Sequence, residues 1–275
     1  MVTKIIATAD IHIRNTKRMD EYQEKLEAFI KKCKEIVNEN GPDKTRIVIV
    51  GDLFHNKLDI SGEGYTMAAW LLRELDKIAK TIVIAGNHDM NMDNLSRLDP
   101  ISALFSMQPF TKTYYLDREA DYESRCIADD NIVWCLYSSF DSFNKPNIAE
   151  TRLKNPDKTF IGLFHGDMKS AKDDSGYQSD KGLDPSYFDE LDCCLMGHIH
   201  KRQCIKYEGT PLVYCGSLIQ QDHGENLSKH GFIVWDVKNS SYDDVDFKDD
   251  KYGYYDFSIE SPDDIDNDKE EIINL

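Results

Sequence analysis

Short apolar runs alternate with helix-like periodicity along the first hundred residues of the chain. The runs at residues 4–9, 46–50 and 81–85 predict buried strands, because a central parallel strand is covered on both faces and reads as a continuous series of Val and Ile. Residues Met19–Asn40 and about 62–79 carry apolar side chains at a spacing of three and four, which predicts two amphipathic helices. This alternation predicts right-handed βαβ units and a mostly parallel sheet.

The pattern changes after residue 110, where apolar runs follow one another at short intervals with fewer helical segments between them. These runs predict a second set of strands. The simplest architecture is an α/β fold in which two packed mixed β-sheets are flanked by helices. The additional strands are expected at residues 113–116, 131–137, 160–164, 193–196, 203–207, 211–215 and 231–237.

The composition is that of a protein with a full core: 40% of the 275 residues are hydrophobic. No apolar run approaches the roughly 20 residues that span a bilayer, and the N-terminus lacks the pattern of a signal peptide. We therefore expect an intracellular protein, cytoplasmic or, in a eukaryotic cell, nuclear, and not a secreted one. The seven cysteines are an odd set without a C-x-x-C motif, which favours reduced core thiols over disulfides or a zinc site.

The net charge of −17 opposes a nucleic-acid ligand, because phosphate backbones are bound largely by cations. The acidity is concentrated at one end of the chain. Residues 242–275 carry 13 acidic and 3 basic side chains, whereas residues 1–241 carry 37 and 30. This distribution suggests a main domain over residues 1–240 and an acidic C-terminal extension over residues 241–275.

Six of the eight histidines fall at the ends of five predicted strands. Ligands of open α/β sheets bind just beyond the carboxyl ends of the strands, so we expect these side chains to meet at one site. A single histidine at a strand end would carry little weight, but five such ends together indicate a shared function. The motifs are Asp10-x-His12, Gly51-Asp52-x-x-His55, Gly86-Asn87-His88-Asp89, His165-Gly166-Asp167 and Gly197-His198-x-His200.

Aspartate, asparagine and histidine without thiolates form the mixed nitrogen and oxygen shell that suits Mn²⁺, Fe²⁺ or Zn²⁺. The number of candidate ligands implies two ions, held close together by a bridging carboxylate. Such a pair can clamp both the attacking and the leaving oxygen of a phosphoryl displacement.

The ordered set of five motifs resembles the calcineurin-like metallophosphoesterases over roughly residues 3–237. The resemblance implies the four-layer αββα sandwich of that superfamily, with residues 1–240 as its catalytic domain. Asp52 is then expected to contact both metals. The implied ligands are Asp10, His12, Asp52 and His200 for one ion, and Asp52, Asn87, His165 and His198 for the other.

The nuclease branch of this superfamily is indicated by the residues that follow Asp52. Phosphoprotein phosphatases usually continue with Asp-Arg-Gly, whereas this chain has Leu53-Phe54-His55. Together with the segment from residue 197 to 217, this is similar to the SbcD-like DNA exonucleases and the meiotic recombination nuclease of break repair. The resemblance implies that His88 contacts the scissile phosphate and that His55 assists it.

The resemblance thus implies a two-metal phosphodiesterase acting on DNA, an exonuclease or endonuclease of repair or recombination in which hydroxide activated by the metals attacks phosphorus. Mn²⁺ is the expected metal, with Fe²⁺, Mg²⁺ or Zn²⁺ as alternatives. The expected partners are DNA, an SMC-type ATPase similar to SbcC, and a second copy of the chain docked through residues 65–79 and 95–105. Candidate substrate-binding cations are Arg14, Lys201 and Arg202.

One departure keeps other functions open. Nucleases of this branch usually continue into a DNA-capping domain, whereas residues 241–275 look like an acidic tail or a remnant of that cap. The missing cap and the negative charge favour a second hypothesis, a phosphodiesterase or phosphatase of small molecules such as cyclic nucleotides. A non-catalytic interaction module is the third, and it would fit a scaffold whose ligands had been lost.

Overall fold

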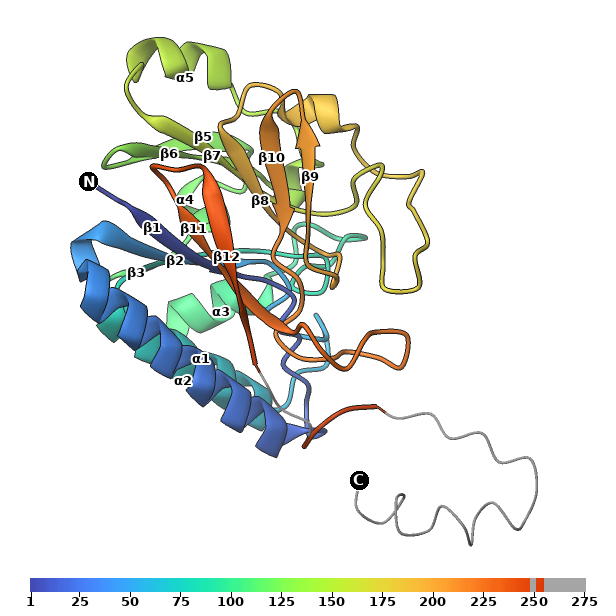
Figure 1. Cartoon of the computed structure of the whole chain (residues 1–275). Helices are drawn as coiled ribbons and strands as arrows, with labels where there is room; N and C mark the ends of the chain where they lie inside the picture. Colours follow the sequence, from blue (N-terminus) through green and yellow to red (C-terminus); the bar gives the residue numbers. More distant parts are fainter. Residues whose placement is uncertain (248–250, 255–275) are drawn as a thin grey trace, which may run out of the picture.

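Two six-stranded β-sheets face one another in the computed structural model, which describes residues 1–247 and 251–254 (Figure 1). The strand order is β12-β11-β1-β2-β3-β4 in the first sheet and β5-β6-β7-β8-β10-β9 in the second. Helices cover the outer faces, so the predicted α/β class with two mixed sheets flanked by helices is confirmed.

The first sheet is parallel from β1 to β4 and antiparallel at its other edge, where β11 pairs with β1 and β12 pairs with β11. Its central strands are buried on both faces, which explains their uninterrupted Val and Ile runs. The strands are β1 Lys4–Thr8, β2 Thr45–Val50, β3 Lys80–Ile84, β4 Thr113–Tyr115, β11 Gly231–Asp236 and β12 Ser241–Asp246.

The second sheet has a parallel centre of β6, β7, β8 and β10, with β5 and β9 added antiparallel at its edges. Its central strands are also buried throughout. The strands are β5 Arg125–Asp129, β6 Ile132–Tyr137, β7 Thr159–His165, β8 Cys193–Gly197, β9 Gln203–Tyr207 and β10 Thr210–Tyr214.

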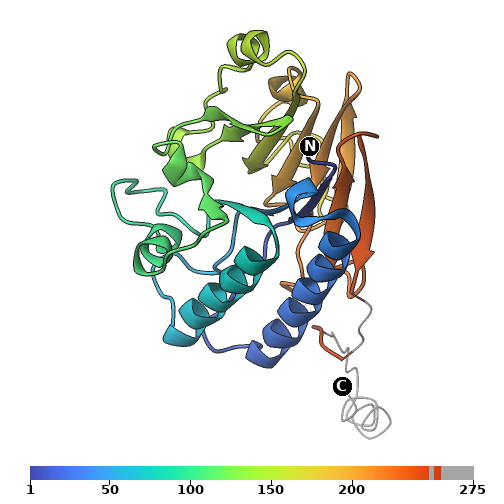
Figure 2. The ribbon, with the colours of Figure 1, turned by 90° about the vertical axis from the view of Figure 1, so that its left-hand side faces the viewer.

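Two long helices, α1 (Met19–Asn40) and α2 (Gly62–Ile78), lie side by side over the outer face of the first sheet (Figure 2). The short α3 (Pro100–Met107) packs into the same apolar layer. None of the helices in the described residues is long and apolar enough to cross a lipid bilayer. The remaining helical segments are α4 Leu116–Glu119, α5 Ile148–Lys154 and the 3₁₀ turns η1 Pro42–Lys44, η2 Ser139–Asp141 and η3 Pro185–Phe188.

Alternate residues of each strand divide the core into three apolar layers. In β2, Ile47 and Ile49 face α1 and α2, whereas Val48 and Val50 face the second sheet. The outer face of the second sheet carries the third layer, under α5 and η3. All seven cysteines have free thiols, and five of them are buried, as the sequence predicts.

The predicted strand positions agree with the structure to within one or two residues at their ends, but two strands were missed. Both are edge strands: β5 carries half-buried and exposed residues, and β12 is mostly exposed and acidic. Such strands lack the apolar run by which central strands are recognised.

The predicted boundary after residue 240 therefore needs correction. It falls within the β11–β12 hairpin, so that residues 241–246 of the expected extension belong to the first sheet. Of the remainder, Tyr254 stacks on Arg18, with 4.7 Å between the guanidinium carbon and the ring centre. Residues 248–250 and 255–275 lie outside the described residues, and with them most of the proposed tail or cap remnant.

A buried ion cluster ties the two sheets together at the end opposite the five motifs. Asp129, at the end of β5, lies 2.8 Å from Arg46 Nε and 2.8 Å from Lys80 Nζ, which begin β2 and β3. Burial by itself would raise the pKa of Asp129, but these two cations outweigh it and lower the pKa to about 2.

Replacing Asp129 by Asn leaves both cations without their counter-charge and is expected to lower the free energy of unfolding by about 3 kcal/mol at pH 7. Because the folded-state pKa is depressed, the contribution is present above about pH 4 and is lost as the pH falls toward 2. Urea unfolding at several pH values measures both effects. Asp121→Asn, in an exposed pair with Arg125, is the control and should change stability little; an equal loss in both variants would contradict the prediction.

Candidate active site

The five motifs converge where the carboxyl ends of strands from both sheets meet. The first three follow β1, β2 and β3 of the first sheet, and the last two end β7 and β8 of the second. One hydrogen bond joins the two groups, because the Nδ1 atom of His165 donates to the Val50 carbonyl at 2.7 Å. Within the first group, Asp10 N donates to the Gly51 carbonyl at 3.2 Å. The predicted ligands therefore lie together at the junction of the sheets.

Several of these ligands have unusual backbone conformations. Asp10, His12, Asp52 and His198 all have positive φ, between 51° and 96°. A residue with a Cβ pays on the order of 1 kcal/mol to adopt the left-handed region, and such strain persists only where the surrounding structure enforces it. Four of the seven expected ligands therefore carry such strain.

Glycines allow the loops to approach this closely. A Cβ added at Gly86 would lie 2.1 Å from Asp52 Oδ1, and one added at Gly197 would lie 2.1 Å from the Val50 carbonyl oxygen. The glycines of the third and fifth motifs are therefore required by close packing. Gly51 of the second motif has in addition a φ of 81°, a conformation that favours glycine.

The first group of ligands consists of Asp10, His12, Asp52 and His200. The Nε2 atoms of His12 and His200 are 3.1 Å apart, and His12 Nε2 is 3.5 Å from Asp52 Oδ2. Two imidazole nitrogens bound to one ion at about 2.1 Å each are separated by about this distance. A carboxylate oxygen of Asp10 completes the group, within 4.8 Å of the nitrogens of His12 and His200.

The second group consists of Asp52, Asn87, His165 and His198. His165 Nε2 is 3.2 Å from Asp52 Oδ2 and 3.2 Å from Asn87 Oδ1, and His198 Nδ1 is 2.9 Å from Asn87 Oδ1. The Oδ2 atom of Asp52 thus lies within 3.5 Å of a nitrogen of each group. These donors, nitrogen and oxygen without thiolate, fit two divalent ions that share one carboxylate.

Hydrogen bonds settle which nitrogen of three imidazoles carries the proton. The Nδ1 atoms of His165, His88 and His200 point at oxygens that only accept, namely the carbonyls of Val50 and His55 and the carboxylate of Glu225. Nδ1 must therefore donate, which leaves Nε2 unprotonated in the neutral ring. In each case Nε2 is the atom available to an ion or a substrate.

Several buried ionisable side chains lie close together in the site and shift one another's pKa values. Burial raises the pKa of Asp10 to about 6. It would by itself lower the pKa of His165, but Asp52 and Asp10 outweigh it and raise that pKa to about 10. Burial would likewise raise the pKa of Asp52, but His165 holds it below its usual value. Divalent cations supply the positive charge that such a set of buried carboxylates needs.

Asp89, quoted in the sequence only as the end of the third motif, joins two of the site loops. Its fully buried carboxylate accepts hydrogen bonds from the backbone N–H groups of Leu53 at 3.1 Å, Phe54 at 2.9 Å and Gly86 at 3.0 Å. It therefore fixes the second motif to the third. Glu225, the partner of His200, was not singled out at all, because it lies in a polar loop without any local signature.

His55 and His88 lie to one side of the first ligand group. The His88 ring centre is 4.7 Å from that of His12, and the His55 and His88 rings stack with centres 5.6 Å apart. Arg14 extends this side of the site, with Nη1 3.3 Å from His55 Nε2 and Nη2 2.9 Å from the Gln221 carbonyl oxygen. The structure thus brings Arg14 together with the two histidines expected to act on the phosphate.

The other two expected substrate cations are placed differently. Lys201 Nζ is 3.0 Å from the Asp173 carbonyl oxygen. The guanidinium of Arg202 lies 3.3 Å from Asp244 and 2.7 Å from Asp246, and its side chain is only 6% exposed. Arg202 is therefore corrected from a substrate contact to a link between the fifth motif and β12.

A family model described as calcineurin-like phosphoesterase matches residues 3–202 of the chain. The chain belongs to this family. The family typically binds two divalent metals, in agreement with the two ligand groups described above.

An uncharacterized protein of Acanthamoeba polyphaga mimivirus is 33% identical over 253 residues, which are 90% of this chain and 18% of that protein. The chain thus spans less than a fifth of the length of this relative. A dimetal phosphatase from Danio rerio is similar in structure, with a TM-score of 0.50 and 11% identity over 86% of this chain and 93% of that one. An archaeal phosphodiesterase matches with a TM-score of 0.41 and 13% identity, over 89% and 99%. The phosphatase likeness supports the fold.

The position of Asp52 Oδ2 between the two groups gives a test that needs no substrate. Asp52→Asn is expected to weaken the binding of both ions, because one atom serves both, whereas His198→Ala should weaken one ion only. Calorimetric titration of the metal-free protein with Mn²⁺ measures the two affinities. Asp167→Asn is the control, since this carboxylate contacts Ser179 and belongs to neither group; loss of a single ion in Asp52→Asn would refute the shared role.

Proposed function

We propose that this chain is a two-metal phosphodiesterase that cleaves DNA in repair or recombination, with Mn²⁺ as the working metal. The observation that carries the proposal is the His55, His88 and Arg14 group beside the first set of ligands. A phosphate diester needs a proton for its leaving oxygen and positive charge for its non-bridging oxygens. This group offers both at one edge of the site.

When bound, two divalent ions would polarise the phosphate and lower the pKa of a water molecule for attack on phosphorus. The chain's own residues would act on the leaving oxygen. His88 donates from Nδ1 to the His55 carbonyl at 2.6 Å, which directs its Nε2 toward the site and fixes the ring. When the His88 ring is doubly protonated, its Nε2–H would deliver a proton to the leaving oxygen, and the ring would return to the neutral form protonated at Nδ1.

The local charge of the site supports binding of a polyanion to an acidic protein. Asp10 and Asp52 contribute two negative charges, which two divalent ions exceed. Arg14, half-buried and held by Gln221, adds a fixed cation beside His55. DNA would then be held by the ions and by Arg14, with Lys201 at the opposite side.

One observation favours the alternative, a phosphodiesterase or phosphatase of small molecules. A hollow next to His198 and His200 is lined by four carboxylates, which repel an extended phosphate backbone on this side of the site. A compact substrate would not extend to these carboxylates. The four are Asp173, Asp174, Asp222 and Glu225.

Cleavage of DNA is expected to disappear in Asp52→Asn and to fall by roughly 10²- to 10⁴-fold in His88→Ala, because the latter loses only its proton donor. Initial rates with Mn²⁺ on single-stranded DNA, duplex DNA and a cyclic nucleotide, under identical conditions, provide the measurement. Asp167→Asn serves as the control and should keep the wild-type rate. Equal cleavage by wild type and both variants would reject the mechanism, whereas turnover of the cyclic nucleotide alone would select the alternative.

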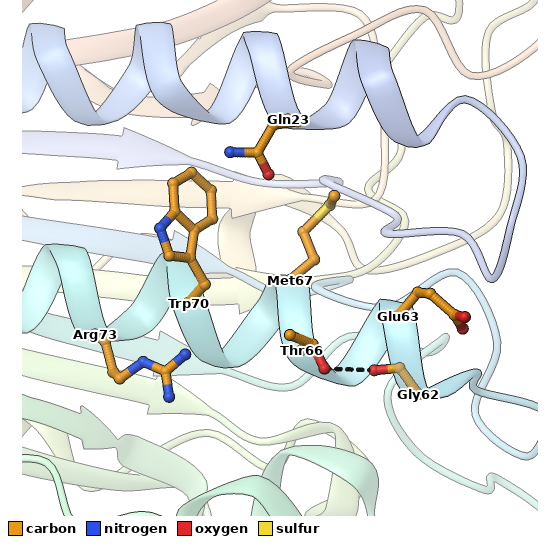
Figure 3. Close-up of a pocket in the computed structure, with 7 residues that line it drawn as sticks. All are labelled: Gln23, Gly62, Glu63, Thr66, Met67, Trp70 and Arg73. Atoms are coloured by element: carbon orange, nitrogen blue, oxygen red, sulfur yellow. Dashed lines mark hydrogen bonds between the residues drawn. The ribbon is translucent and has the colours of Figure 1, made fainter.

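The resemblance also underlies our proposal of a homodimer and of an SMC-type ATPase as partner. For the dimer, the structure offers apolar side chains at the surface around α2 and α3: Leu98 is 68% exposed and Met107 is 72% exposed. A groove between α1 and α2 lies on an adjoining surface, where Trp70 and Met67 of α2 face Gln23 of α1 (Figure 3). The ATPase partner is tested by co-purification with the full-length protein.

Replacing Leu98 and Met107 together by Asp is expected to turn the dimer into a monomer, because two buried apolar contacts per subunit would become charges. Light scattering coupled to size-exclusion chromatography measures the mass. Leu153→Asp, on α5 and 84% exposed, is the matched control and should remain dimeric. A wild-type protein that is monomeric at high concentration would exclude the proposal.

A further inference from the structure

A carboxylate contacts one of the ligand imidazoles from behind. Glu225 lies in the loop between β10 and β11, and its Oε1 atom is 2.5 Å from His200 Nδ1. The opposite edge of the same ring points into the site, where His200 Nε2 is 3.1 Å from His12 Nε2. The carboxylate, the imidazole and the first ligand group are thus arranged in series.

Glu225 is held in this position by its own loop. Its Oε2 atom accepts hydrogen bonds from Gln221 N at 2.9 Å and from Ser217 Oγ at 3.5 Å, and its carbonyl accepts one from Gln220 Nε2 at 2.9 Å. The side chain is only 7% exposed. The carboxylate is therefore fixed independently of His200, which lets it determine where the ring points.

The same loop also holds the backbone of His200. Ser217 N donates to the His200 carbonyl at 2.9 Å, and Ser217 Oγ is 3.0 Å from His230 Nδ1. Residues 217–225 thus contact His200 at both its main chain and its ring. This connects the fifth motif to a segment that has none of the family's ligands.

The other imidazoles of the cluster lack such a partner within the described residues. The Nδ1 atom of His165 meets the neutral carbonyl of Val50, and the buried Nδ1 atom of His12 has no hydrogen-bond partner. His200 alone among the described ligands receives a full negative charge on its second nitrogen. A carboxylate in this place fixes the tautomer and the ring orientation and makes the imidazole a stronger ligand.

We propose that Glu225 is a positioning residue that holds His200 as a ligand, with the Nδ1–H toward the carboxylate and the bare Nε2 toward the first ligand group. The inference rests on the proposed two-metal centre but not on the nature of the substrate. It assigns the 217–225 loop a part in metal binding in addition to packing.

Calorimetric titration with Mn²⁺, in the absence of substrate, tests this role. Glu225→Ala is expected to weaken one of the two ions by roughly 10- to 100-fold and to leave the other unchanged. Glu225→Gln should lose less, because its amide oxygen still accepts the N–H but carries no charge. Asp222→Asn is the matched control and should bind both ions normally, because this carboxylate lies in the same loop and accepts a hydrogen bond from Gly224 N.

A double-mutant cycle separates positioning from general loop damage. If Glu225 acts through His200, the double variant His200→Ala with Glu225→Ala should bind Mn²⁺ no more weakly than His200→Ala alone. The Nδ1 proton of His200 can be observed by NMR in the metal-free protein. Its downfield signal should disappear in Glu225→Ala, shift in Glu225→Gln and remain unchanged in Asp222→Asn. This second readout stands even if an alanine variant folds poorly.

The possible failures are distinguishable. Two Mn²⁺ ions bound with unchanged affinity by wild type and Glu225→Ala alike would overturn the role of Glu225 and leave the metal centre intact, as would losses that add in the double variant. A wild-type protein that binds no Mn²⁺ would overturn both the metal centre and the inference. Normal metal binding by all controls without cleavage of DNA would reject only the proposed substrate.

Discussion

The arrangement of the site depends on two carboxylates that are buried at the junction of the two sheets. Asp10 is fully buried and Asp52 is 2% exposed, and neither is paired with Lys or Arg in the described residues. Taking such groups out of water is costly unless opposite charge and hydrogen bonds compensate. Imidazoles supply part of the compensation here, and divalent ions are the natural source of the remainder. The five strand ends, the left-handed ligand residues and the close-packed glycines all serve to bring these donors around two carboxylates.

Backbone hydrogen bonds hold this arrangement in place before any ion binds. Asp52 Oδ1 accepts from His88 N at 2.8 Å, and Asp10 Oδ1 accepts from His198 N at 2.9 Å, so each carboxylate is oriented by the loop that carries a neighbouring ligand. Asp89 fixes the second motif to the third in the same manner. A site preorganised in this way avoids much of the entropy cost of assembling ligands around an ion.

The surroundings of the site divide into two sides of opposite character. His55, His88 and Arg14 form one side, which carries hydrogen-bonding nitrogens and the positive charge of Arg14. Carboxylates of two loops form the other side, next to His200, and one of them, Glu225, contacts the His200 ring. The charge next to the site thus differs from the net charge of the chain, because Arg14 lies on one side and the carboxylates gather on the other. The family and the fold are established by these residues and by the comparisons, whereas the substrate is decided at these two sides.

The sequence by itself determined the central strands, the two long helices and the candidate ligands that meet at one site. A strand buried on both faces must be apolar along its length, and a polar residue directly after it, such as Asp52, lies at the sheet edge whatever the rest of the fold does. Only the tertiary structure decided the remaining features. These are the edge strands β5 and β12, the ion cluster of Asp129, the position of Arg202 away from the site and the contact of Glu225 with His200. The two edge strands pair with their neighbours in the chain but lack an apolar run by which they could be recognised. The other three features depend on segments far apart in the chain, whose distance is set by the packing of the two sheets. Local periodicity indicates whether a residue is buried but not which residue it contacts.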